Sequence, residues 1–564
     1  MRRPTLLPPL LAPLLAVLVL AGCGSSSSSS GTEADPVSAV PAGAPLLLEA
    51  TVRPQGALGS GALAAGKELT GQADPYLRLL GALSAPGSAA PDFKRDVAPW
   101  LGARAAMFVS SISAAGPLVT VVQQALTGGG SIAGAPFGHG QLDGAIVMDT
   151  SDAVRARSFL AAQAKRAGAR ATSYRGVSYE ATSGGLAFGL VRRFAVIGSE
   201  AGLRGVIDTT QGGAPLSAAA GYAKLLASAP AGAIGHLYAN PRSPSAPAAR
   251  SAEAKGVLSL LGGERQTNVS AILADGSLAL DIDSLGAAGE GSLLSADPRA
   301  AAALAKLPGE SWLAIGIGDA RRSLAGDVAG LQAFGSLLGN SGEAGSTLSI
   351  PSIVGGLTAP LKVLAGPSAA ARRDFSSWMG AAGIFTAGSS LLELKGAVVI
   401  ESTDAARSRA AVAKLGTALR AQGAGVSKLS LPGTEAAIAT RLSGLPLVLD
   451  IAAGRGSDGR PRFVLGLGEQ SVAAALAPAS TLNGSAAVSA AGRALGEGAP
   501  PSLLLDVPTL VSLLEGVGLA ESHSVAEVLP FLRAATTVSG GGHSLGGEVQ
   551  RYRLVLGLRR TSAG

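Results

Sequence analysis

The residues best able to do chemistry are few in this chain of 564 residues, and their spacing matches no familiar site. The four histidines are His139, His236, His523 and His543. None lies four residues from another, so the H-E-x-x-H pattern of zinc enzymes is absent, as are the G-x-S-x-G elbow, the S-x-x-K pair and the P-loop. We therefore expect no catalytic, metal-binding or cofactor-binding residues, and a protein that is not an enzyme. His236 lies in an apolar stretch and is expected to be a core residue.

One glycine-rich connection is weakly similar to a dinucleotide-binding loop. Gly466-Leu467-Gly468 lies between an apolar stretch and a helix-forming stretch. The position of the third glycine is occupied by Ser471, and Glu469 would repel a pyrophosphate. We therefore expect a tight strand-to-helix connection and no cofactor.

A stretch that contains several charged residues occurs twice in the chain, and its pattern indicates the secondary structure on which those residues lie. Residues 142–160 read LDGAIVMDTSDAVRARSFL, and residues 394–412 read LKGAVVIESTDAARSRAAV, so the pattern returns at a constant offset. Each copy has an apolar run, a polar break and then helix-forming sequence. The pattern predicts a buried strand followed by a helix.

The polar break supplies a helix start in both copies. Ser151 and Thr403 are the expected N-caps, because a hydroxyl there accepts a bond from a free backbone N–H. Asp152 and Asp404 follow, and each places negative charge at the positive end of its helix. We expect these acids to have structural roles, in capping or in pairing with adjacent arginines.

A tryptophan motif is repeated as well. Residues 94–102 read KRDVAPWLG, and residues 372–380 read RRDFSSWMG. Trp100 and Trp378 are expected to be core anchors next to a strand; a surface ring for stacking on a sugar is the alternative. Matches in the same order along both halves indicate a tandem duplication.

The N-terminal segment has the pattern of an export signal. Two arginines precede an apolar stretch at 6–20, which is shorter than the roughly 20 residues that span a bilayer. It ends in Leu20-Ala21-Gly22-Cys23, which resembles the lipobox of bacterial lipoproteins. That resemblance implies cleavage before Cys23, attachment of acyl chains such as palmitate, and anchoring on the extracytoplasmic face of the cell membrane. The alternative is an ordinary secreted protein, although Cys23 is the only cysteine.

The repeated motifs resemble an uncharacterised bacterial envelope family. The basic-Asp-x-x-x-Trp-x-Gly motif and the strand followed by a (Ser/Thr)-Asp-Ala helix are similar to the family catalogued as domain of unknown function 3352. The resemblance covers nearly all of the chain after the leader. It implies a shared fold and brings no catalytic residues.

The fold class that we expect is α+β, with two tandem duplicated lobes. Each lobe is predicted to be a mainly antiparallel sheet with helices packed on one face, because short turns join successive strands. One long strand is expected at 171–182, and a hairpin at 268–284 around Asp275-Gly276. A helix at 405–420 carries its apolar residues on one stripe.

The expected domain boundaries follow from these patterns. They are a lipoprotein signal peptide at 1–22, a Ser-rich tether at 23–36, a first repeat at 37–290 and a second repeat at 291–564. Residues 114–140 have no counterpart in the second repeat. They form either a binding loop or a low-complexity insertion.

Composition restricts the partners. Charged residues make up only 15% of the chain, and the net charge of +7 is scattered rather than clustered, which does not predict a nucleic-acid partner. We expect a membrane-anchored lipoprotein that binds an unknown ligand or envelope protein without catalysis. The alternatives are a solute receptor of a transporter and, less favoured, a hydrolase of wall polymers.

Overall fold

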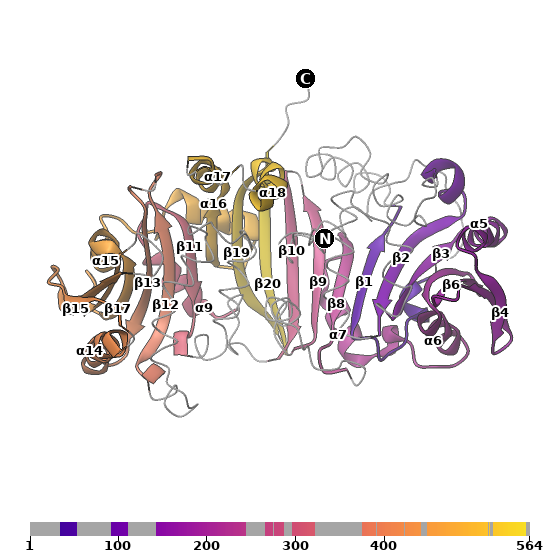
Figure 1. Cartoon of the computed structure of the whole chain (residues 1–564), viewed down its shortest axis with the longest axis horizontal. Helices are drawn as coiled ribbons and strands as arrows, with labels where there is room; N and C mark the ends of the chain where they lie inside the picture. Colours follow the sequence, from indigo (N-terminus) through magenta and orange to yellow (C-terminus); the bar gives the residue numbers. More distant parts are fainter. Residues whose placement is uncertain are drawn as a thin grey trace, which may run out of the picture. The chain divides into compact units, whose positions relative to one another are not determined.

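The computed structural model describes most of two compact units. The described residues are 34–53, 92–110, 143–243, 265–274, 276–286, 296–321, 375–390, 392–421, 423–441, 448–516, 518, 520, 523–546 and 548–559. The first unit ends at Leu285, and the second runs from Gly286 to Arg559. Figure 1 shows both units as mixtures of strands and helices.

The described residues of the first unit form ten strands in one antiparallel sheet. Its strands are β1 (Leu46–Thr51), β2 (Leu101–Val109), β3 (Gly144–Thr150), β4 (Arg170–Tyr174), β5 (Val177–Ala181), β6 (Leu186–Val191), β7 (Phe194–Ser199), β8 (Ala233–Ala239), β9 (Thr267–Ala274) and β10 (Ser277–Leu285). Their order across the sheet is β10-β9-β8-β1-β2-β3-β7-β6-β5-β4, and every pair is antiparallel. The helical segments are η1 (Pro36–Ala39), η2 (Phe93–Val97), α5 (Ala153–Arg166), α6 (Glu200–Thr210), η4 (Leu216–Ala218) and α7 (Ala220–Ser228).

The part of the second unit that the structure describes also has ten strands. They are β11 (Ser311–Ile317), β12 (Met379–Ala387), β13 (Lys395–Ser402), β14 (Val426–Lys428), β15 (Thr434–Arg441), β16 (Val448–Arg455), β17 (Pro461–Leu467), β18 (Pro501–Asp506), β19 (Ala535–Gly546) and β20 (Val549–Leu558). Their order is β20-β19-β18-β11-β12-β13-β17-β16-β15-β14, again antiparallel throughout. If each strand is numbered from the start of its unit, the two orders are identical. The helices are α9 (Pro298–Ala305), α14 (Ala405–Ala421), α15 (Gly468–Leu476), α16 (Ala486–Leu495), α17 (Val507–Gly516) and α18 (His523–Ala534).

The repeated stretch folds as the sequence predicts, into β3 and α5 in one unit and β13 and α14 in the other. The expected cap is wrong by one residue. The N-cap of α5 is Asp152, whose Oδ1 accepts from the backbone N–H of Val154 and of Arg155 at 3.0 Å. Asp404 likewise accepts from the N–H of Arg407 at 3.0 Å. The hydroxyl of Ser151 instead reaches the carbonyl oxygen of Leu101 at 3.4 Å, and that of Thr403 donates to the carbonyl oxygen of Trp378 at 3.0 Å, so the carboxylates accept from the free N–H groups.

The prediction of a single strand at 171–182 is also wrong. The chain turns back at Arg175 and Gly176, which have φ angles of 47° and 78°, so that β4 pairs with β5. Two consecutive positive φ angles fit the twist of a two-residue hairpin. The arginine concealed this turn, because residues other than glycine rarely adopt such angles.

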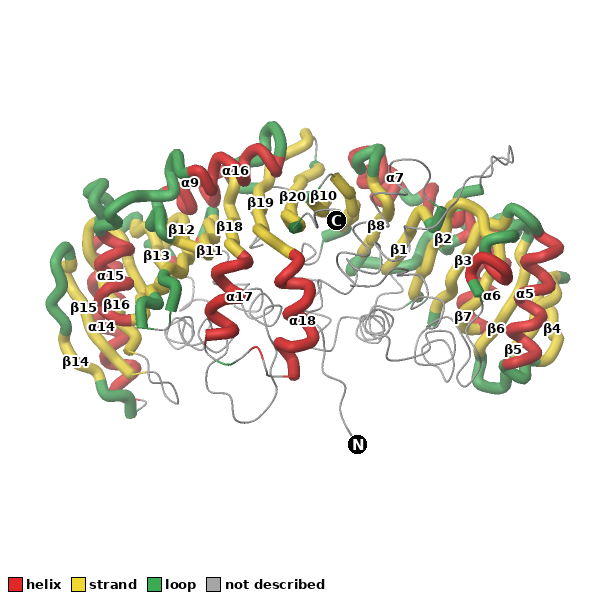
Figure 2. The backbone as a smooth tube through the Cα atoms, turned by 90° about the horizontal axis from the view of Figure 1, so that it is seen from above, coloured by secondary structure: helices red, strands yellow, loops and turns green. Residues whose placement is uncertain are grey.

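Helices cover both faces of the second sheet, which corrects the expectation of helices on one face. One core contains Val398 and Ile400 of β13 together with buried residues of α14, α17 and α18. The other core contains Val399, between them in the strand, together with residues of α9, α15 and α16. Figure 2 shows α9 and α16 on one side of the strands and α17 and α18 on the other. Successive side chains of a strand point to opposite faces, so a strand that is apolar at every position needs cover on both.

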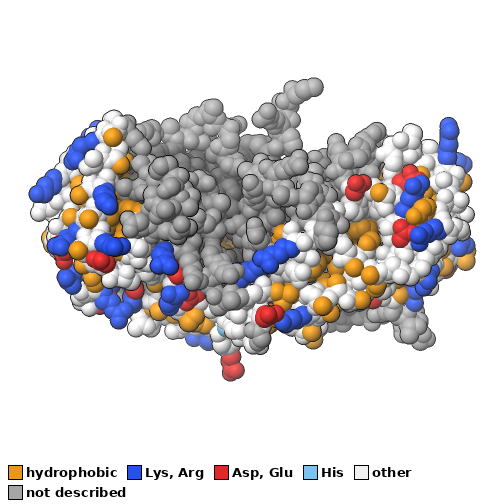
Figure 3. All heavy atoms as spheres, turned by 90° about the horizontal axis from the view of Figure 1, so that it is seen from below, with side chains coloured by type: hydrophobic (Ala, Val, Ile, Leu, Met, Phe, Trp, Pro, Cys, Tyr) orange, Lys and Arg blue, Asp and Glu red, His pale blue; other side chains and the backbone are white. Residues whose placement is uncertain are grey.

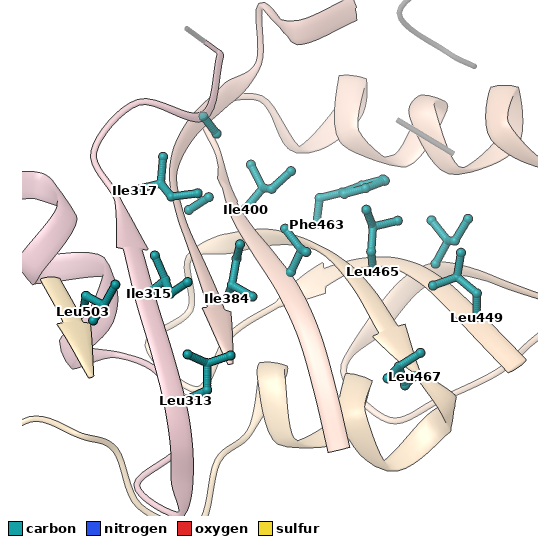
Figure 4. Close-up of a cluster of buried hydrophobic side chains, with 14 of the residues drawn as sticks. Leu313, Ile315, Ile317, Ile384, Ile400, Leu449, Phe463, Leu465, Leu467 and Leu503 are labelled. Carbon is teal, nitrogen blue, oxygen red and sulfur yellow. The ribbon is translucent and has the colours of Figure 1, made fainter. Parts of the chain in front are cut away.

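The first of these cores is the larger. Figure 4 shows apolar side chains of neighbouring strands side by side on one face, among them Ile315, Ile384 and Phe463. Phe463 is 0% exposed, as are Leu415 of α14 and Leu465. The helix stripe predicted for 405–420 therefore packs on this sheet, as its spacing indicated.

The folded structure starts earlier than the expected boundary at residue 37. Asp35 caps η1 by accepting from the N–H of Val37 at 3.0 Å, and Pro36 is buried. The last residues of the predicted tether, Asp35 and Pro36, are therefore part of the fold. The 114–140 segment lies outside the described residues. Among the helices that the structure describes, none is long and apolar enough to cross a membrane.

Candidate functional site

A row of polar side chains crosses the sheet of the first unit. Glu49 of β1 lies opposite His236 of β8, His236 lies opposite Ser270 of β9, and Ser270 lies opposite Asp281 of β10. Residues directly opposite each other in adjacent strands point to the same face. Four polar side chains on four consecutive strands therefore share one face. Ser270 and Asp281 are both 0% exposed.

Glu49 is held by charge and by a hydroxyl. Its carboxylate is 2% exposed and forms an ion pair with Arg104 of β2. Tyr222 of α7 donates its hydroxyl to Glu49 Oε2 at 3.3 Å. Arg104 also lies 3.5 Å from Asp35, which caps η1. Glu49 therefore has the partners that a buried carboxylate needs, and the network links β1, β2, η1 and α7.

His236 is neutral in this environment. Burial, and then the charge of Arg104, lowers the pKa of His236 to about 4. Its Nδ1 lies 3.1 Å from Ser270 Oγ, and Asn268 donates to the same oxygen at 3.0 Å. Burial also raises the pKa of Tyr222 and that of Tyr238, the latter to about 12, so both hydroxyls stay protonated at neutral pH.

The arrangement holds a serine beside a histidine, but it lacks the geometry of a catalytic pair. In a catalytic pair the serine oxygen must reach a substrate carbonyl, and an acid must orient the histidine from its other nitrogen. Ser270 is fully buried, and the carboxylate of Glu49 is committed to Arg104 and Tyr222. The network joins β1 to β2 and α7, and β8 to β9, within the first unit.

The second unit has largely apolar rows on the equivalent strands. The row through β11, β18, β19 and β20 that starts at Ala314 continues with Leu504, Ser539 and Val555. The next row starts at Ile315 and continues with Leu503, Gly540 and Leu554. Neither row contains a charged residue or a histidine. Among the rows compared, that of the first unit carries a buried charge and a histidine, and those of the second unit do not.

The second unit has a buried acid of its own. Asp450 of β16 is 1% exposed, and neither of its carboxylate oxygens has a hydrogen-bond partner among the described residues. Its cross-strand neighbours are Ala439 and Gly466, whose side chains cannot donate. Burial, and then the charge of Glu469, raises the pKa of Asp450 to about 6. Such a group is costly while it is ionised.

Both repeated tryptophans are core anchors, as expected. Trp100 and Trp378 are each 2% exposed and immediately precede β2 and β12. Trp100 donates its ring N–H to the carbonyl of Asp96 at 2.8 Å. Trp378 packs on Phe463 with ring centroids 5.1 Å apart. Buried rings cannot stack on a sugar in solution.

The repeated acids pair as expected where they are described. Asp96 accepts from Arg95, and this bond lowers the pKa of Asp96. Asp152 lies 3.5 Å from Arg155, and the corresponding distance from Asp404 to Arg407 is 3.6 Å. Their roles are structural.

The remaining predicted residues have varied outcomes. Leu20, Ala21, Gly22 and Cys23 lie outside the described residues, as does His139. Across the part of the chain that is described, no group of three or more His, Cys, Asp or Glu side chains could hold a metal ion. The connection at Gly466-Leu467-Gly468 leads directly from β17 into α15, as the sequence predicts.

Sequence reasoning missed Glu49, Arg104 and Asp450. A signal was present in each case, because each charge interrupts an apolar stretch: LLLEA around Glu49, GARAAM around Arg104 and LVLDIAA around Asp450. A charged residue within a buried strand requires a partner or a shifted pKa. The partners of Glu49 come from β2 and α7, so pairing could not be deduced from the strand alone.

The comparisons with known proteins give a family and a weak structural likeness. A family described as "Protein of unknown function (DUF3352)" matches residues 11–556. No curated protein matches the sequence. The crystal structure titled "Structure of crystal form I of TP0453" is 9% identical and covers 45% of this chain and 80% of that chain, with a TM-score of 0.24. A TM-score of that size establishes no common fold.

Proposed function

This chain belongs to the family of proteins of unknown function DUF3352, and from that premise we propose that it is a membrane-anchored extracytoplasmic lipoprotein that binds a ligand or an envelope partner without catalysis. The observation that carries the proposal is the leader that ends in Leu20-Ala21-Gly22-Cys23. Cys23 is the only cysteine of the chain. A free thiol on an exported protein is a liability, whereas an acylated one is an anchor.

We further propose that the two units arose by tandem duplication. The identical strand order of the two sheets supports this, as does the constant spacing between residues 142–160 and 394–412. In both copies the repeated stretch is a strand, a carboxylate cap and a helix. The two sheets are the paired lobes that such an anchor would hold outside the membrane.

A binding role is favoured over the two alternatives. Solute receptors of transporters are usually built from parallel α/β lobes, whereas both sheets here are antiparallel. A wall hydrolase needs accessible acid and base groups, and the polar network around Glu49 is buried. These observations favour an interaction protein.

The test is mass spectrometry of the full chain extracted from its native membrane. We expect an N-terminal peptide that starts at Cys23 and carries acyl chains, and the same extract reports any small molecule that remains bound. A Cys23→Ser variant, matched in expression, should lose the acyl mass. An intact leader, or unmodified Cys23 in membrane-bound protein, would refute the anchor.

A further inference from the structure

The solvent-facing sides of α5 and α14 carry basic charge only. α5 contains Arg155, Arg157, Lys165 and Arg166, and α14 contains Arg407, Arg409, Lys414 and Arg420. Neither helix contains an acidic residue, and all eight basic residues are exposed. By contrast, α6 combines Glu200 and Asp208 with its single arginine.

Several of these charges are not neutralised by the protein. Arg155 and Arg407 lie near the carboxylates that cap their own helices, and Arg409 lies 3.4 Å from Glu435. Arg157 and Lys165 in α5, and Lys414 and Arg420 in α14, form no ion pair with the residues that the structure describes. Each unit therefore presents a helix with uncompensated positive charge.

Most of the exposed side chains between the charges are small. In α5 they include Ser158, Ala161 and Ala162, whereas Val154, at the start of the helix, is a larger apolar residue that is 70% exposed. In α14 they include Ala406, Ala410 and Ala413. A face of this kind can approach a flat surface closely, and it has no large aromatic residue that would insert into a bilayer. Figure 3 shows Lys and Arg side chains, in blue, gathered on the end of unit 2 that carries α14.

We infer that α5 and α14 are docking faces for the anionic phospholipid headgroups of the membrane to which the chain is anchored. This inference rests on the proposed anchor, because a tether of about ten residues keeps the start of the fold within on the order of 20 Å of the membrane. At that distance the nearest dense anionic surface is the membrane itself. Its potential attracts basic side chains and falls off within a Debye length, about 8–10 Å at physiological salt. Docking by these faces positions the units that the anchor alone leaves free to rotate.

The test measures vesicle binding of the full chain with Cys23→Ser, so that no acyl chain contributes. Vesicles of phosphatidylglycerol and phosphatidylcholine are compared with vesicles of phosphatidylcholine alone, by co-sedimentation. Binding through the apolar leader would be equal for all variants, so it cancels in the comparison. We expect binding that requires phosphatidylglycerol and is lost when salt is raised from about 0.1 M to about 0.5 M.

Two paired variants report on the faces. Arg157→Gln with Lys165→Gln, and Lys414→Gln with Arg420→Gln, should each lower the partition constant by on the order of tenfold. The matched control is Arg242→Gln with Arg493→Gln, which removes the same charge from exposed sites; Arg493 lies on α16, on the other face of the second sheet. The circular dichroism spectrum and the melting temperature should be unchanged in the two paired variants and in the control, because the substituted side chains are exposed.

The outcomes separate this inference from the anchor. Equal losses in the control, or binding that ignores phosphatidylglycerol, would overturn the docking faces. Retention on a soluble polyanion without vesicle binding would overturn them too, in favour of an anionic polymer. An unmodified Cys23 with intact vesicle binding would refute the anchor and leave the docking faces standing.

Discussion

The backbone N–H of Thr403 donates to the carbonyl oxygen of Trp378 at 2.8 Å, and the hydroxyl of Thr403 donates to the same oxygen at 3.0 Å. In the first unit the N–H of Ser151 donates to the carbonyl of Trp100, also at 2.8 Å. In both units this contact joins the residue before the helix cap to the tryptophan before the neighbouring strand. The tryptophan is therefore fixed both by its buried ring and by its backbone.

Removing the ring of Trp378 should destabilise the second unit strongly. Trp378→Ala leaves a cavity beside Phe463 and should cost about 4 kcal/mol of unfolding free energy, whereas Trp378→Phe should cost less. Chemical denaturation measures both. Trp312→Ala is the comparison, because that ring is only partly buried. A loss for Trp378→Ala no greater than for Trp312→Ala would contradict the anchoring role.

The caps can be tested by comparing neighbours in the sequence. Asp152→Ala and Asp404→Ala should each lower the free energy of unfolding by about 1 kcal/mol, because free N–H groups of the helix lose their acceptor. Ser151→Ala should have a smaller effect, since its hydroxyl only reaches the carbonyl of Leu101 at 3.4 Å. Thermal or urea unfolding decides between them. If Ser151→Ala proved the more damaging change, our assignment of the cap would be incorrect.

The ion pair between Glu49 and Arg104 should respond in a non-additive way. Glu49→Gln leaves the arginine without its buried partner and should cost about 3 kcal/mol. Glu49→Leu combined with Arg104→Leu should recover part of that loss, because no buried charge is left unpaired and the side chain of Asp35, the other partner of Arg104, is 39% exposed to water. The matched control is Glu515→Gln, which breaks the exposed pair with Arg533 and should cost less than about 1 kcal/mol.

Asp450 should make the second unit more stable in mild acid. Its folded-state pKa of about 6 lies above the ordinary value of 3.8, so the folded state binds the proton first as pH falls. The Asp450 contribution therefore falls as pH rises from about 4 to about 6, with a total of up to about 3 kcal/mol, and is constant above that. Asp450→Asn should stabilise the protein at neutral pH and remove this dependence. The exposed Glu497→Gln should not, and equal pH profiles for wild type and Asp450→Asn would exclude the effect.

The contribution of His236 to stability should change with pH in the opposite direction. Its folded-state pKa of about 4 lies below the ordinary 6.5, so the unfolded chain takes up the proton first. The His236 contribution is complete above about pH 6.5 and is lost as pH falls toward 4, by up to about 3 kcal/mol. His236→Asn keeps a polar atom near Ser270 without that titration. The difference between variant and wild type, followed by urea unfolding across this range, measures it; a constant difference would rule the effect out.

Much of the fold is readable from local patterns. Apolar runs and turn residues predicted β3, β13, β6, β7 and the β9–β10 hairpin. A stripe of apolar residues along one side of the helix predicted α14. These elements depend on short-range chemistry, in which each residue type has a preferred backbone geometry. The lipobox around Cys23 is likewise a pattern of adjacent residues, and it remains a prediction because the described residues do not include it.

Only the tertiary structure decided which residues contact the buried polar groups. The sequence determined that Glu49 is charged and lies in an apolar strand; the fold decided that Arg104 and Tyr222 meet it there, 55 and 173 residues away. From the sequence we expected helices on one face of each sheet, and only the packing of α14 on one face and α15 on the other showed that both faces of the second sheet are covered. The physical reason is the same in each case: desolvation and charge pairing depend on which distant segments are adjacent in space, and that arrangement is a property of the whole chain.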